Sequence, residues 1–305
     1  MIGQIIKKQR ILKNKTQQEL AEGICSTKYI YLIEREERNP SAYILNQLSE
    51  KLAIDLFEYY QYLEFENPVA VIEHRKNIDK YIQAGDLEKL KEESMKAAQI
   101  EDFQKEPLSY DIMVIDSLHK GLLEGKTSET ISELTEAFDK EELNIDSLTL
   151  INGYTVLSTC YQIEGQLDQA KKILDQAYGL IKNKKDFPRY HSVIINVMIS
   201  LISYFYNAEE YEALKKYSKE LIDFQEEQNK FNQIYYPYYL LSYAYYQSNQ
   251  LMKAKEYFMK AVHSTLLFKN KIDLMILVEM IDFNELIEAL AIDEYYILNN
   301  SYLQL

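Results

Sequence analysis

Turn positions recur at nearly constant spacing through most of this chain. Successive positions are separated by 40, 40, 44 and 40 residues. They are Gly85, Gly125, Gly165, Glu209 and Asn249. Such a period indicates one supersecondary unit used several times, with each unit burying its apolar side against its neighbours. Only eight Gly and five Pro occur in 305 residues, which is too few for a sandwich, a barrel or a Gly-rich nucleotide fold. The units are therefore predicted to be pairs of long helices.

Two of the units share the same residue types at the same offsets from the turn. One set is Leu157, Ser158, Tyr161, Leu167, Ala170, Leu174 and Ala177; the other is Leu241, Ser242, Tyr245, Leu251, Ala254, Phe258 and Ala261. The small members let paired helices approach closely. This pattern resembles the tetratricopeptide repeat, whose period is about 34 residues, so the helices here are expected to be about a turn longer. We expect an all-α chain with five helix pairs in a right-handed solenoid, closed by one or two capping helices within residues 271–305.

The first sixty residues have a different organisation. Apolar spacing over residues 2–60 predicts four or five short helices. Thr16 and Glu19 form a capping box, Ser26 can cap a third helix, and a fourth is expected to begin near Ser41. Two short helices joined by a tight turn make a helix-turn-helix. The expected core positions are Leu20, Ala21, Ile24, Ile30, Ile33, Ile44, Leu45, Leu48 and Leu52.

Charge is distributed unevenly between these two parts. The chain carries a net charge of −14, yet residues 1–60 hold nine Lys or Arg and eight Asp or Glu, a net of +1. The remaining residues carry −15. A small basic head on a large acidic body is typical of a DNA-binding domain joined to a sensor domain. The alternative is that the basic side chains form an ordinary solvated face.

Several segments of the head resemble the lambda-repressor-type helix-turn-helix. They are Arg10, TQQELA at 16–21, CSTKYIYLIE at 25–34, RNPS at 38–41 and LSEKLAI at 48–54. The chain departs from that family in having Asn14 and Lys15 where Gly-x is common, and one residue fewer before Ser26. The resemblance implies phosphate contacts and contacts to base edges. The phosphate contacts fall to Gln17 and Ser26, with Lys13 as a further backbone charge. The base-edge contacts fall to Thr27, Lys28 and Tyr31. A helical bundle with no role in DNA binding is the alternative interpretation.

The repeat resemblance also implies a ligand face. In tetratricopeptide repeats the exposed positions of the first helix lie 13, 10, 6 and 3 residues before the turn. In the third pair these positions are Asn152, Thr155, Thr159 and Gln162. In the fourth pair they are Asn196, Ile199, Ser203 and Tyr206, and in the fifth they are Tyr236, Tyr239, Tyr243 and Tyr246.

These residue types suit an extended peptide. An Asn amide offers both a donor and an acceptor to a peptide backbone, and Asn152 and Asn196 occupy equivalent positions. Tyrosines offer flat apolar faces with a hydroxyl at the rim. Two alternatives remain open: the tyrosines could serve helix packing, and each Asn could cap a neighbouring backbone carbonyl.

Head and body together resemble the Rgg/PlcR-type peptide-pheromone regulators. The resemblance implies a helix-turn-helix domain with a linker helix at residues 1–66 and a peptide-sensing, dimerising repeat domain at residues 67–305. It implies a cytoplasmic homodimer that binds double-stranded operator DNA and is controlled by a short signalling peptide, with no cofactor and no reaction catalysed. The main alternative is control by a protein partner instead of a peptide. A second alternative is a phosphatase-inhibiting repeat protein of the same wider superfamily. It is disfavoured because those proteins lack a helix-turn-helix.

Other features agree with that expectation. The two cysteines, Cys25 and Cys160, suit a reducing compartment, and the first residues show no signal-peptide pattern. The most apolar run, residues 193–206, is too short to cross a bilayer, so no membrane association is expected. A near match to a phosphate-binding loop at residues 121–127 has the wrong spacing and follows a helix. The four histidines are scattered, so no metal site or enzymatic activity is predicted.

Overall fold

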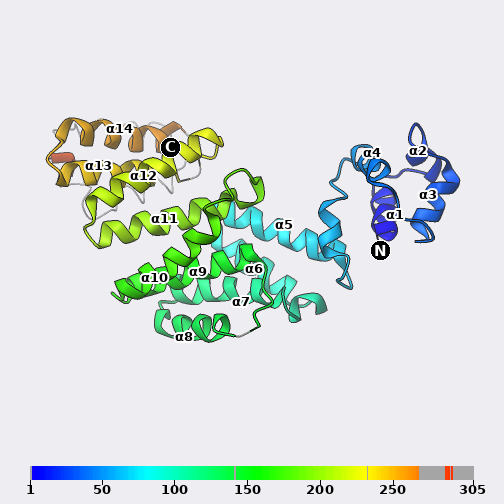
Figure 1. Cartoon of the computed structure of the whole chain (residues 1–305), viewed down its shortest axis with the longest axis horizontal. Coiled ribbons are helices and arrows are strands. Elements are labelled where there is room, and N and C mark those ends of the chain that lie inside the picture. Colours follow the sequence, from blue (N-terminus) through cyan, green and yellow to red (C-terminus); the bar gives the residue numbers. More distant parts are fainter. Residues whose placement is uncertain (1, 141, 232, 268–285, 289, 291–305) are drawn as a thin grey trace. The chain divides into compact units, whose positions relative to one another are not determined.

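The computed structural model describes residues 2–140, 142–231, 233–267, 286–288 and 290. These residues form helices, turns and loops, with no strand among them, and the prediction of an all-α chain is confirmed. The chain divides into two compact units, residues 1–112 and 113–305. Figure 1 follows the helices from α1 to α14 along the chain.

The head begins the first unit and contains five short helical elements. They are α1 (Ile2–Leu12), α2 (Gln17–Ala21), α3 (Thr27–Glu34), α4 (Ala42–Leu52) and the 3-10 helix η1 (Glu58–Tyr62). The predicted caps are confirmed: Thr16 and Glu19 form the capping box, Ser26 accepts the N–H of Tyr29, and Ser41 caps α4. These contacts satisfy backbone donors that a helix start leaves without partners.

The core of the head forms where the apolar spacing predicted it. Leu20, Ala21, Ile30, Ile33, Leu45, Leu48 and Leu52 are buried, whereas Ile24 and Ile44 are half-buried against them. Gly3 sits where α1 crosses α3. A Cβ at this position would meet the carbonyl oxygen of Ile33 at 1.9 Å, so the close approach of the two helices depends on a glycine.

After the head, the chain enters the first long helix pair. Asn67 caps α5 (Pro68–Ala84), which is followed by α6 (Leu87–Ala97) and the 3-10 helix η2 (Glu101–Gln104). The buried carboxylate of Asp102 accepts the backbone N–H groups of Glu66 and Asn67, each at 2.9 Å. η2 thereby holds the segment that leads from the head into α5.

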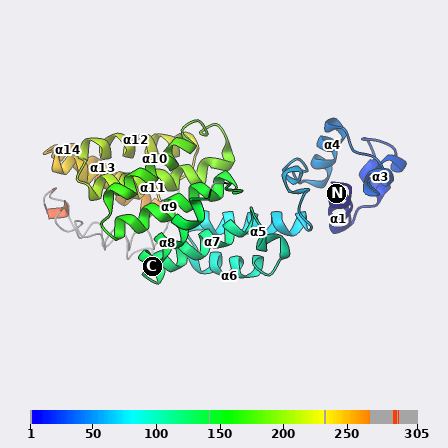
Figure 2. The same cartoon turned by 60° about the horizontal axis from the view of Figure 1, so that its bottom comes forward.

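The body continues with further helices arranged as pairs. α7 (Ser109–Leu118) and the π-helical turn η3 (His119–Leu123) precede α8 (Thr127–Phe138), and α9 (Ser147–Ile163) precedes α10 (Leu167–Ile181). After the short η4 (Pro188–Tyr190) come α11 (His191–Asn207), α12 (Tyr211–Glu227), α13 (Tyr235–Gln247) and α14 (Leu251–Leu267). α13 and α14 lie side by side in both views (Figures 1 and 2).

The predicted turn positions are confirmed by their backbone angles. Gly85, Gly125 and Gly165 have φ of 65°, 68° and 70°, and Glu209 and Asn249 have φ of 57° and 56°. These angles lie in the left-handed region, where glycine is the least strained residue. The repeat therefore places the same turn between the two helices of each pair, even where the glycine is replaced.

The small residues at fixed offsets also lie where the repeat predicted them. Ala170 and Ala177 on α10, and Ala254 and Ala261 on α14, have no exposed surface. The Ser242 hydroxyl donates to the carbonyl of Ala254 at 2.7 Å, which joins α13 to α14. Within the body, α9 packs against α11 and α11 packs against α13, so the first helices of successive pairs are neighbours.

The predicted capping helices at residues 271–305 lie almost entirely outside the described residues. Leu286, Ile287 and Leu290 are described, and they are buried against the same apolar core as α11 to α14. None of the helices in the described part of the chain is both long and apolar enough to span a bilayer.

Candidate DNA-binding surface and ligand-binding face

Helix α3 has one side in the core and one side in solvent. Ile30 and Ile33 are fully buried, while Thr27 and Lys28 are exposed and Tyr31 is 43% exposed. The three residues predicted to reach base edges therefore lie on the solvent side of the second helix of the motif. A recognition helix presents its side chains to the major groove in this way.

Arg35 holds the Tyr31 side chain, and Glu37 in turn pairs with Arg35. The guanidinium of Arg35 donates to the Tyr31 hydroxyl at 2.8 Å and lies 5.5 Å from the ring centroid. The Nε of Arg35 is 2.7 Å from a carboxylate oxygen of Glu37. The hydrogen bond to Tyr31 is the main reason that the pKa of Arg35 is raised. Arg35 was not among the predicted DNA-contacting residues, although its spacing of four residues from Tyr31 indicates a contact on a helix.

The residues predicted to contact phosphates have partners within the head. Gln17 donates from its amide to a carboxylate oxygen of Glu34 at 2.7 Å. Ser26 accepts the N–H of Tyr29 at 3.2 Å. A carboxamide has two N–H donors and a hydroxyl has one, so each side chain retains a donor for a phosphate. Lys13 is exposed just after α1. The phosphate contacts remain predictions.

The body brings together many of the side chains predicted to form a ligand face. Ser203 on α11 is 2.9 Å from the Tyr236 hydroxyl on α13. The rings of Tyr206 and Tyr243 meet edge to face with centroids 5.0 Å apart. Tyr243 also lies 6.5 Å from the ring of Tyr246. α11 also packs against α9. We call α9, α11 and α13 the inner helices.

Two polar side chains on the inner helices have no hydrogen-bond partner among the described residues. Asn152 on α9 and Asn196 on α11 are half-buried, and within the described residues neither carboxamide has a hydrogen-bond partner. The structure therefore does not support the alternative that these amides cap backbone carbonyls. Thr155 and Thr159 differ, because each hydroxyl donates to a carbonyl one turn earlier in its own helix. The Gln162 carboxamide oxygen accepts from Asn207 at 3.3 Å.

The prediction for Tyr239 is wrong as far as its exposure is concerned. Its side chain has no exposed surface and belongs to the apolar core, so it presents no face to a ligand in this structure. Nine of the 13 residues of α13 are buried, because α11, α12 and α14 all pack around this helix. Only a narrow stripe is left, and it carries the half-buried Tyr236, Tyr243 and Tyr246. Ile199 is half-buried on α11.

The inner helices share one electrostatic property. None of the residues in α9, α11 or α13 is Asp, Glu, Lys or Arg, whereas the partner helices α10, α12 and α14 carry many charged residues. Burial raises the pKa of Tyr236, so this face stays neutral around physiological pH. Within the described residues no three His, Cys, Asp or Glu side chains gather where a metal could bind.

The comparison with protein families decides the nature of the head. The helix-turn-helix family matches residues 6–59. These residues are a helix-turn-helix domain. No curated protein matches the chain.

Solved structures share the fold of most of the chain. PlcR of Bacillus thuringiensis, solved in complex with the peptide PapR7 and DNA, superimposes with a TM-score of 0.72 at 17% identity and covers 91% of this chain and 99% of its own. A structure described as a transcriptional regulator from Listeria monocytogenes gives a TM-score of 0.55 at 13% identity over 96% of this chain and 99% of its own.

A third solved structure is ComR of Streptococcus thermophilus in complex with DNA and its signalling peptide ComS. It superimposes with a TM-score of 0.52 at 13% identity and covers 90% of this chain and 96% of its own. The chain thus has the fold of helix-turn-helix transcription regulators, as the resemblance predicted.

Proposed function

We propose that this chain is a cytoplasmic transcription regulator that binds operator DNA as a homodimer. Control comes from a short signalling peptide bound along the inner helices. In this account residues 1–66 are the DNA-binding domain and residues 67–305 are the peptide-sensing and dimerising domain. The exposed side of α3 and the fold shared with PlcR and ComR support the first part of the proposal.

The carboxamides of Asn152 and Asn196 carry the peptide part of the proposal. Both are half-buried on adjacent helices, and neither has a partner within the described residues. Both amides still reach solvent, so an extended ligand can pair with each of them in place of water. An extended peptide backbone offers N–H and C=O groups along its whole length.

The chemistry of the face limits the peptide. The inner helices carry no charged side chain, so a charged residue buried against them would have no partner. The tyrosine stripe on α13 offers apolar surface to aliphatic or aromatic side chains. The peptide is therefore mainly apolar, with its terminal charges outside the stretch that contacts these helices.

Titration of operator DNA with and without peptide tests the proposal. Candidate peptides come from the gene next to the one that encodes this chain, and fluorescence anisotropy measures DNA affinity at fixed salt. The account expects one such peptide to change the affinity. Light scattering should give a dimer at micromolar concentration. A monomer both with and without DNA would remove the dimer from the account, and a response only to a protein partner would favour that alternative.

A further inference from the structure

Three lysines in the body converge on one tyrosine ring. The ammonium groups of Lys215, Lys219 and Lys253 lie 5.4, 5.4 and 5.3 Å from the ring centroid of Tyr245. Lys215 and Lys219 come from α12, Lys253 comes from the first turn of α14, and the ring comes from α13. We call these four residues the Tyr245 lysine cluster. Three like charges around one ring repel each other, so the arrangement suits an added anion.

The ring is a fixed base for the cluster. Tyr245 is only 4% exposed, and it stacks on Tyr257 with centroids 5.5 Å apart and an angle of 12° between the planes. An aromatic face attracts an ammonium group, and Lys219 donates a hydrogen bond to the Tyr245 hydroxyl, which raises the pKa of that lysine. The ring therefore orients the lysines without neutralising them.

Carboxylates balance these charges only in part. Lys215 is 8% exposed, and its ammonium pairs at 2.6 Å with Glu212, a side chain that is 88% exposed. Within the described residues, neither Lys219 nor Lys253 forms an ion pair, although the charge of Asp223 contributes to the raised pKa of Lys219. Two cations thus lie without an ion-pair partner beside a buried third one, in a body whose net charge is negative.

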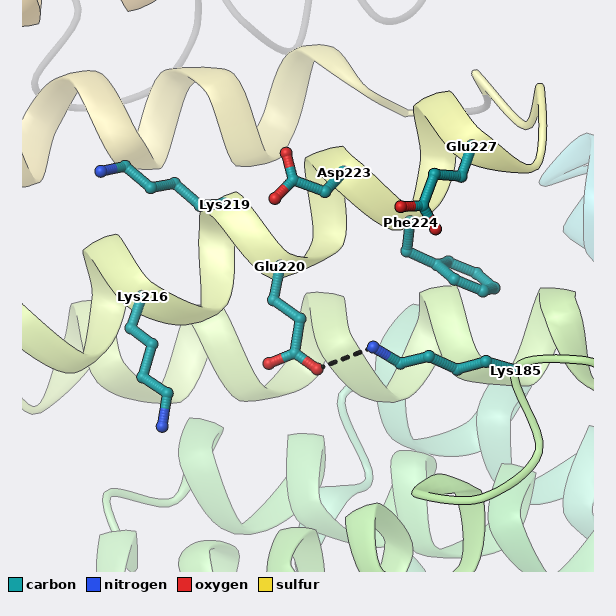
Figure 3. Close-up of a pocket in the computed structure, with 7 residues that line it drawn as sticks. All are labelled: Lys185, Lys216, Lys219, Glu220, Asp223, Phe224 and Glu227. Atoms are coloured by element: carbon teal, nitrogen blue, oxygen red, sulfur yellow. Dashed lines mark hydrogen bonds and ion pairs between the residues drawn. The ribbon is translucent and has the colours of Figure 1, made fainter.

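A hollow lies beside the cluster, bordered by Glu212, Lys215, Lys216, Lys219, Tyr245 and Gln250. A second, neighbouring hollow along α12 provides a contrast. That hollow shares Lys216 and Lys219 with the first one, but Lys185, Glu220, Asp223 and Glu227 also border it, and Lys185 pairs with Glu220 at 3.0 Å. Figure 3 shows this balanced hollow, with the ammonium of Lys219 directed away from the Lys185–Glu220 pair. The excess of positive charge therefore belongs to the hollow beside Tyr245.

We propose that the Tyr245 lysine cluster binds a small anion of the phosphate class, either free phosphate or the phosphate group of a small metabolite. Lysine is a point-charge donor that suits such an oxyanion. The site is separate from the inner tyrosine stripe. Two residues along a helix turn the side chain by about 200°, so Tyr245 lies on the opposite side of α13 from Tyr243. This proposal does not depend on peptide binding or DNA binding.

Calorimetry on the full chain at constant ionic strength tests the site, with inorganic phosphate and glycerol 3-phosphate as probes. The wild type should bind one anion per chain. The double variant Lys219→Gln/Lys253→Gln should bind at least about tenfold more weakly, because two charge-assisted contacts are lost. Lys172→Gln is the matched control, since Lys172 is exposed on α10, away from the cluster. This variant should bind phosphate like the wild type. Tighter binding of the inorganic ion assigns the site to free phosphate, whereas tighter binding of the ester assigns it to a metabolite.

Four results would overturn the proposal. The first is no heat beyond that of chloride in the wild type. The second is unchanged affinity in the double variant when circular dichroism shows it folded. The third is an equal loss in Lys172→Gln, which would show only general charge attraction. A single-stranded oligonucleotide that binds where phosphate does not would also contradict a small-anion site.

Discussion

Arg10 and Glu34 are joined by two hydrogen bonds, at 2.6 and 2.9 Å, that connect α1 to α3. The Glu34 carboxylate is almost fully buried and also accepts from Gln17, at the start of α2. Arg10 in turn donates to the carbonyl of Lys15 at 2.8 Å. One charged pair thereby fixes the three helices that set the orientation of the predicted DNA-reading surface.

Breaking this pair should destabilise the head. Arg10→Met leaves the buried Glu34 without its cation, which should cost about 3–5 kcal/mol, and the double variant Arg10→Met/Glu34→Leu should recover much of the loss. Glu37→Gln, which removes an exposed partner of Arg35, should cost about 0–1 kcal/mol. Native-state hydrogen exchange of the α1 and α3 amides measures each effect. Equal effects of Arg10→Met and Glu37→Gln would show that the buried pair has no special role.

The exposed lysines of the head should differ in what they recognise. Lys28→Ala and Thr27→Ala should reduce the preference for the operator, because a well-placed base contact contributes about 1–3 kcal/mol of discrimination. Lys13→Ala should weaken binding to all sequences alike and lower the salt slope by about one unit. Titrations on specific and scrambled duplexes separate the two classes. If Lys28→Ala weakens both duplexes equally, the assigned orientation of α3 on DNA is wrong.

The Tyr31 hydroxyl should act as a donor toward DNA. Because Arg35 already donates to its oxygen, the remaining phenolic proton suits an acceptor such as a purine N7 or a thymine O4. Tyr31→Phe should therefore lower operator preference and leave the salt slope unchanged. Tyr43→Phe is a matched control, since Tyr43 is a 70% exposed tyrosine on α4. A change in salt slope, or the same loss of preference in the control, would contradict this role.

The thiol of Cys160 should be inert in the folded protein. Burial raises the pKa of Cys160 to about 11, so the thiolate that reacts with alkylating reagents is scarce at mildly alkaline pH. A Cβ on Gly121 would approach its sulfur to 2.7 Å, which indicates how closely α9 is packed there. In a Cys25→Ser background, iodoacetamide should modify Cys160 only after denaturation. Rapid labelling of the native protein would show that this part of the core opens readily.

Local sequence rules predicted the parts of the fold that depend on neighbours in the chain. The capping box at Thr16 needs only residues three apart, and the turns at Glu209 and Asn249 follow from the period of the repeat. The small residues on α10 and α14 follow from the same period. For these features, the spacing of residues in the sequence determines the local geometry.

Contacts between distant segments could not be read from spacing. The 0% exposure of Tyr239 results from three helices that pack around α13. The spacing of residues within α13 does not show which helices pack against it. Asp102 lies 35 residues from the Asn67 N–H that it accepts. The tight crossing at Gly3 depends on a carbonyl of α3. Each of these features requires knowledge of which elements meet in space.

The proposed peptide site makes a paired prediction for the two open amides. Asn152→Ala and Asn196→Ala should each weaken peptide binding by about 1–3 kcal/mol, roughly ten- to a hundredfold. Operator binding without peptide should stay unchanged, because the substitutions lie outside residues 6–59, which form the helix-turn-helix domain. Asn144→Ala is the control, since Asn144 is exposed in the loop before α9.

Calorimetric titration of the signalling peptide into the wild type and these three variants tests the central claim most directly. The account predicts a measurable affinity in the wild type, the same affinity in Asn144→Ala, and a loss in both Asn152→Ala and Asn196→Ala that abolishes the peptide's effect on DNA binding. Wild-type peptide affinity in either inner-helix variant would contradict it. The tyrosines of α13 would then be packing residues only.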